Sequence, residues 1–123
     1  MNKPAKSFRD LIVWQKAHEF VLKTYGLTKQ LPREERFCLI PQIRRAGISI
    51  PANVAEGFRK RGPADKNRLF NTSQGSLEEC RYYLILGQDL GYGDCLALEP
   101  LLDDVSRILI AYAQAVERNA ALR

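Results

Sequence analysis

The side chains best arranged for chemistry form one line along residues 41–61. Amide, guanidinium, hydroxyl and carboxylate groups recur there at alternating spacings of three and four residues. They are Gln42, Arg45, Ser49, Asn53 and Glu56, the polar stripe, with Lys60 at the end of the line. On a helix this spacing gives one stripe about 80° wide, opposite a broad apolar arc. It is either an active-site strip, a solvated face, or a hydrogen-bond network shared with neighbouring helices.

The residue types of the polar stripe favour the network. Exposed helix faces are usually coated with Lys and Glu, whereas Gln42, Ser49 and Asn53 are short and neutral. Arg45 is within reach of Ser49, and Asn53 within reach of Glu56, along the same face. We therefore predict that the stripe fixes the register of a helix bundle or the contact between subunits, and that it performs no chemistry. A solvated face is the alternative.

Residues that usually carry catalysis lack partners at a useful spacing. His18 is the only histidine, and it falls on an apolar seam, so we interpret it as a core or interface imidazole. The acidic pairs Glu78–Glu79 and Asp103–Asp104 have no histidine three residues on, as a di-iron bundle requires. The sequence has no P-loop, GxGxxG loop, HExxH motif or nucleophile elbow. We expect no catalytic residue, metal site or cofactor, and an enzyme is the weakest class.

Basic residues gather directly after the polar stripe and at the N-terminus. The densest cluster is Arg59, Lys60 and Arg61, with Lys66 and Arg68 beyond a turn; the second is Lys3, Lys6 and Arg9. Residues 1–68 carry 15 Lys/Arg and 6 Asp/Glu (+9), and residues 69–123 carry 4 and 8 (−4), which together give the formal charge of +5. The first cluster is a candidate phosphate-binding surface. An ordinary helix end, where cations favour the negative end of the dipole, is an equally weighted alternative.

Four helices position these groups. Apolar periodicity predicts them at 8–30, 41–61, 63–90 and 97–121, and no alternating run bounded by turns predicts a strand. The predicted seam of the first helix is Leu11, Trp14, His18, Val21, Tyr25 and Thr28. Short connections then favour an antiparallel up-and-down four-helix bundle, in one domain covering residues 1–123.

Proline and glycine set the boundaries of the two middle helices. Pro41 suits the first position of a helix, and Gly62-Pro63 suits an N-cap followed by a first helical residue. Pro51 interrupts the ladder of hydrogen bonds, but the stripes continue in phase across it, which favours one bent helix over two. The third helix has a seam of small residues, so we expect it to approach the equally small central helix closely.

Cysteine usage and hydropathy indicate a cytoplasmic protein. Cys38, Cys80 and Cys95 are odd in number and lack CxxC spacing, so we interpret them as reduced thiols, mostly in the core. The longest apolar run, near 108–113, is too short to span a bilayer. We expect neither secretion nor a membrane partner.

Several segments resemble one bacterial family in order along nearly the whole chain. They are Asp10-Leu11-Ile12-Val13-Trp14-Gln15-Lys16-Ala17, Gln42-Ile43-Arg44-Arg45-Ala46, Ser49-Ile50-Pro51-Ala52-Asn53-Val54-Ala55-Glu56-Gly57, Gly75-Ser76-Leu77-Glu78-Glu79 and Leu90-Gly91-Tyr92. The family is the bacterial four helix bundle proteins, first noticed as proteins encoded in intervening sequences of 23S ribosomal RNA genes. Ile40-Pro41 departs from its pattern, which more often has Thr-Ser there.

The resemblance implies a left-handed antiparallel bundle that assembles as a homopentamer. It also implies kinship with the accessory variability proteins of diversity-generating retroelements, basic bundles that bind nucleic acid and a reverse transcriptase. We therefore predict a non-enzymatic oligomer that binds RNA or DNA with low sequence specificity. The alternative is a scaffold that recruits a protein partner and has no nucleic-acid role.

Overall fold

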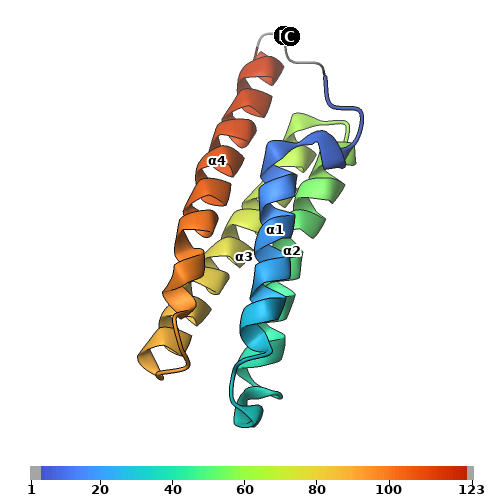
Figure 1. The fold of residues 1–123 in the computed structure, drawn as a ribbon. Coiled ribbons are helices and arrows are strands. Elements are labelled where there is room, and N and C mark those ends of the chain that lie inside the picture. The colour runs from blue at the N-terminus through green and yellow to red at the C-terminus, as the bar shows by residue number, and fades with distance from the viewer. Residues whose placement is uncertain (1–3, 122–123) are drawn as a thin grey trace.

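The computed structural model describes residues 4–121, and in that range it has four long helices and no strand. The helices are α1 (Ile12–Thr28), α2 (Leu39–Arg59), α3 (Pro63–Asp89) and α4 (Glu99–Ala121). They lie side by side (Figure 1). Both α1 and α3 pack against α2 and α4, so the four helices enclose one core. The prediction of an all-α chain with four helices is confirmed.

The core is built from aliphatic and aromatic side chains of all four helices. Its largest fully buried members include Phe20, Ile43, Ile50, Phe70, Leu77, Leu84, Leu102 and Leu109. Burying each such side chain contributes about 1.5–3 kcal/mol. The core therefore holds the helix ends, where the basic residues lie, in a fixed arrangement.

The first predicted helix, 8–30, begins later than its periodicity indicated. Phe8–Asp10 forms a separate 3₁₀ turn, and Leu11 is extended with φ −78° and ψ 127°. Asp10 explains the break, because its Oδ2 accepts hydrogen bonds from the backbone N–H groups of Lys6 (2.9 Å) and Ser7 (3.3 Å). The carboxylate caps the short turn and does not lie in the first turn of α1.

The buried face of α1 is also one residue away from the predicted seam. Val13, Ala17, Phe20 and Thr24 are buried, whereas Trp14 and Val21 are half-buried and His18 is exposed; of the predicted seam only Thr28 is buried. One residue corresponds to a rotation of about 100°. The interpretation of His18 as a core imidazole is wrong for the single chain: its ring stacks on Trp14 with centroids 5.0 Å apart. Imidazole and indole keep polar atoms near water at little cost.

The central helix α2 begins at Leu39, two residues before the predicted start. Its first N–H is capped by Glu35, whose Oε1 accepts from the backbone of Leu39 at 3.2 Å. Pro41 therefore occupies the third helical position, where its missing N–H still leaves no intrahelical bond unmade. Pro51 lies inside the continuous helix, so the prediction of one helix across this proline is confirmed.

The small seam of α3 packs against α2, as predicted. This is the most extensive contact between any two helices. The buried hydroxyl of Ser73 donates to the carbonyl of Ile50 at 2.8 Å. Gly57 lets the two backbones come close, because a Cβ there would lie 2.6 Å from the ring of Phe70. The helix ends at Asp89, and Gly91 follows with a φ of 81°, the left-handed conformation of a glycine C-cap.

The last helix follows a 3₁₀ turn at Cys95–Leu98 and starts at Glu99, two residues after its predicted start. Cys80 and Cys95 are buried, and burial raises the pKa of the Cys80 thiol to about 12. Cys38 is exposed at the start of α2, so the expectation of core thiols holds for two of the three.

Candidate nucleic-acid interface

The densest basic cluster lies where α2 turns into α3. Arg59 is the last residue of α2, Lys60 is extended with ψ 148°, and Gly62 and Pro63 start α3. Arg59 and Arg61 are exposed, and Lys60 is half-buried. Within residues 4–121, no carboxylate lies within 4.0 Å of the charged groups of these three residues. No ion pair in the described part of the chain therefore neutralises these three charges.

Lys66 belongs to the same end, but it has a structural role that the sequence did not indicate. Its Nζ donates to the carbonyls of Phe58 (2.6 Å) and Gly57 (3.3 Å), in the last turn of α2. The ammonium also lies 5.5 Å from the centre of the Phe58 ring. Partial burial lowers the pKa of Lys66. Lys66 thus caps α2 and holds it to α3.

Arg68 and Lys6, two other cations singled out from the sequence, also lie near this end of the bundle. Arg68 lies 3.8 Å from Asp65, an exposed pair one turn apart on α3. Lys6 lines a hollow of about 290 Å³ together with Arg59, so the N-terminal cluster meets the first cluster in space. Lys3 lies outside the described residues.

The polar stripe divides into a bonded centre and exposed ends. The Asn53 amide donates to the carbonyl (2.8 Å) and hydroxyl (2.9 Å) of Ser49. The Ser76 hydroxyl, on α3, donates to Ser49 at 2.7 Å, so the centre links two helices. Gln42, Arg45 and Glu56 are exposed.

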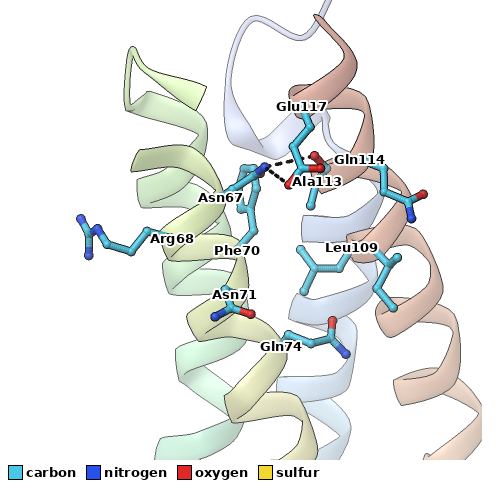
Figure 2. A pocket seen from close by; sticks show the side chains of 10 residues that line it. Asn67, Arg68, Phe70, Asn71, Gln74, Leu109, Ala113, Gln114 and Glu117 are labelled. Atoms are coloured by element: carbon cyan, nitrogen blue, oxygen red, sulfur yellow. Dashed lines mark hydrogen bonds between the residues drawn. The ribbon is translucent and has the colours of Figure 1, made fainter. Parts of the chain in front are cut away.

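A groove between α3 and α4 was not predicted. Its volume is about 390 Å³, and amides line much of it (Figure 2). Asn67, Asn71 and Gln74 share one face of α3 at spacings of four and three, a signal that reads in sequence as an ordinary solvated face. The Asn67 amide donates to the Ala113 carbonyl at 3.2 Å, and that of Gln74 donates to Ser106 at 2.8 Å. These bonds hold α3 to α4.

Neither a metal-binding cluster nor a membrane-spanning helix occurs in the described part of the chain. Residues 4–121 contain no group of three or more His, Cys, Asp or Glu side chains arranged to hold a metal ion. No helix in this range is both long enough and apolar enough to cross a bilayer.

Comparison with known proteins identifies the family. The family model described as "23S rRNA-intervening sequence protein" matches residues 9–111, from within the first 3₁₀ turn to the middle of α4. The chain belongs to the 23S rRNA-intervening sequence protein family. The polar stripe and all of Arg59, Lys60, Arg61, Lys66 and Arg68 lie within the matched residues, whereas Lys6 lies outside them.

A solved structure supports the same family fold. It is the 1.70 Å crystal structure of a protein of unknown function from the S23 ribosomal protein family of Bacteroides thetaiotaomicron. The two chains are 25% identical and superpose with a TM-score of 0.76, over 83% of this chain and 98% of the other. No curated protein matches this member of the 23S rRNA-intervening sequence protein family.

Proposed function

We propose that this family member binds RNA or DNA with low sequence specificity through the basic end of the bundle. The observation that carries the proposal is a set of cations at the α2–α3 turn with no carboxylate partner among residues 4–121: Arg59, Lys60 and Arg61. Neutralising phosphates with such cations releases condensed counterions, which drives sequence-independent binding. Phosphate contacts position a nucleic acid but carry no base information, hence the low specificity.

We also propose an antiparallel, left-handed bundle that assembles as a homopentamer, as the resemblance to the family implies. The short connections between the helices support the antiparallel order. The exposed ends of the polar stripe, Gln42, Arg45 and Glu56, are the proposed subunit contact. A ring would repeat the basic end and multiply its effective concentration toward one strand.

The main test compares two charge reversals of equal size. The first variant is Arg59→Glu, Lys60→Glu and Arg61→Glu; Lys66 is kept because it caps α2. The control is Lys29→Glu, Arg33→Glu and Arg36→Glu, which reverses three exposed cations at the opposite end of the bundle (Figure 1). Binding of fluorescent RNA and DNA is followed by anisotropy across a salt series.

The wild type should bind less tightly as salt rises, with a slope of log K against log salt near −0.7 per phosphate contact on single strands. The first variant should lose binding by at least about tenfold and have a shallower slope, because phosphate contacts are lost. The control should bind nearly as the wild type. Salt-independent binding, or equal losses in both variants, contradicts the proposal.

Light scattering on the same samples tests assembly. A homopentamer has a mass of about 70 kDa, five times 14.0 kDa. Arg45→Ala with Glu56→Gln should lower that mass if the stripe ends form the contact. A 14.0 kDa species in the wild type contradicts the assembly.

The second candidate is a protein-interaction scaffold. Phe37, beside the guanidinium of Arg36 (4.7 Å), is 80% exposed and lies at the end far from the basic cluster. A protein partner that stays bound after nuclease treatment, with no salt-dependent RNA or DNA binding, would favour this function.

A further inference from the structure

Two neighbouring hollows lie on the outer side of α1 and α2, and together they are called the aromatic trough. One, of about 300 Å³, includes Trp14, His18, Ile48 and Pro51 in its lining. The other, of about 290 Å³, includes Lys6, Phe58 and Arg59. Phe8 and Ala55 line both. This aromatic trough therefore leads from the middle of α1 to the basic end.

Aromatic rings form a ladder along the trough. The Phe8 and Trp14 rings are tilted by 59° with centroids 5.1 Å apart. The Trp14 and His18 rings are nearly parallel, at 10°, with centroids 5.0 Å apart. His18 is exposed, so the ladder ends in a flat ring that a further planar group can extend.

Cations lie at one end of the ladder. Among the described residues, Lys6 and Arg59 line the second hollow, and the lining of the first contains no Lys, Arg, Asp or Glu. The Arg9 guanidinium lies 5.7 Å from the centre of the Phe8 ring. The nearby carboxylate of Asp10 is held by the backbone N–H groups of Lys6 and Ser7. A ligand that fits this surface has flat apolar groups joined to anionic ones.

We propose that the aromatic trough binds unpaired bases of a single-stranded nucleic acid, while Arg59 and Lys6 contact its phosphates. This rests on the proposed function and names the form of nucleic acid that the basic end recognises. Stacking on aromatic rings accepts every base, because each base has a π-face, and so it agrees with low sequence specificity. In a duplex the base faces are already stacked on neighbouring bases, so they are not free to stack on the aromatic rings of the trough.

A second copy of this chain would also cover an apolar face. The cations of the second hollow favour an anionic ligand, and two copies paired face to face at the trough would bring these cations near one another. In a ring, a different surface of the next copy would meet the trough. The two occupants differ in the measurement below, since a second copy needs no nucleic acid.

Trp14 makes the test direct, because it is the only tryptophan in the chain. The full-length protein is titrated with an unlabelled single strand of about 12 nucleotides, within the range of known single-strand sites, and with the duplex of the same sequence. Trp14 emission and anisotropy of a labelled strand are recorded together. The single strand should quench Trp14 emission and bind at least about tenfold more tightly than the duplex.

His18→Ala removes the exposed ring and leaves the cations in place. It should weaken single-strand binding by roughly tenfold. The salt slope should not change, because the substitution removes a stacking contact and leaves every phosphate contact in place. Tyr82→Ala is the matched control, an aromatic residue that is 57% exposed on α3 and should leave binding unchanged.

The outcomes separate this inference from the proposed function. In one outcome, binding depends on salt and is abolished by the Arg59, Lys60 and Arg61 reversals, but Trp14 emission is unchanged and the duplex binds equally well. This outcome overturns the binding of bases in the trough and leaves the proposed function standing. No binding of any nucleic acid overturns both. A shift in Trp14 emission with protein concentration alone, together with a rise in mass, assigns the trough to a second copy and also overturns it.

Discussion

Helix α3 contacts α2 and α4 in two different ways. Toward α2 it presents Ser73, Ser76 and the side of Phe70 that meets Gly57, and the two helices lie close together. Toward α4 it presents Asn67 and Gln74, and a groove of about 390 Å³ remains (Figure 2). The oxygens Asn67 Oδ1 and Gln74 Oε1 are buried there without a hydrogen-bond partner among the described residues.

The difference shows that polarity alone does not decide how well a contact packs. The hydroxyls of Ser73 and Ser76 are short enough for every polar atom to reach a partner while the helices approach. The amide side chains of Asn67 and Gln74 are longer, and each carries a donor nitrogen and an acceptor oxygen. The nitrogens are bonded, whereas the oxygens have no partner among residues 4–121. An unpaired buried oxygen cancels much of what the bonded nitrogen contributes. We therefore expect substitutions on the α2 side to be costly and those on the α4 side to be mild.

The largest effect should come from Gly57→Ala. The new methyl group would lie 2.6 Å from Phe70 and 3.3 Å from the Cβ of Leu69, both buried. Such overpacking destabilises by about 1–3 kcal/mol. Gly75→Ala is the control on α3, where a Cβ meets nothing within 4 Å and the substitution should stabilise by about 0.5–1 kcal/mol. Urea unfolding followed by circular dichroism measures both; equal effects would remove the distinction between close and open contacts.

A smaller loss is expected for Ser73→Ala. It removes a buried hydrogen bond to the Ile50 carbonyl, and such bonds contribute about 1 kcal/mol. The neighbouring Thr72→Ala removes a similar hydroxyl-to-carbonyl bond, to Arg68 at 3.1 Å, from an exposed site. Its effect should stay within about 0.5 kcal/mol. If the two variants unfold at the same urea concentration, burial of the Ser73 hydrogen bond does not increase its contribution to the free energy of unfolding.

The smallest effect is expected for Gln74→Leu, one residue further along α3. It deletes the 2.8 Å bond to Ser106 but also removes the unpartnered oxygen, and leucine fills a similar volume. The free energy of unfolding should change by less than about 0.5 kcal/mol. A loss above about 1 kcal/mol, measured as for Ser73→Ala, would show that the α4 side is as demanding as the α2 side.

Much of the fold was predictable because it depends on local rules. Gly62 and Pro63 place the start of α3 correctly, and the phase of the stripes across Pro51 predicts one continuous α2. The small residues of α3 predicted its close contact with α2. These features depend on backbone geometry and side-chain size, which a sequence states directly.

The site was less predictable because it depends on contacts between segments. The seam of α1 was one residue off, since Trp14 and Val21 are as apolar as Phe20, and only packing against α2 decides which face is buried. No spacing reveals that Lys66 bonds to carbonyls of α2, or that Lys6 meets Arg59. The amides of the α3–α4 groove recur in the sequence at helical spacing. Which of their atoms find hydrogen-bond partners depends on the position of α4, which the spacing does not indicate.

The bond from Lys66 to the end of α2 has a consequence for binding thermodynamics. Because one side chain ties the last turn of α2 to the first turn of α3, the backbone that carries Arg59, Lys60 and Arg61 has little freedom left to lose. Ordering a loose loop on association costs free energy, and a turn that is already ordered avoids that cost. Under the proposed function, Lys66 acts as a preorganising residue whose ammonium bonds to the carbonyls of α2.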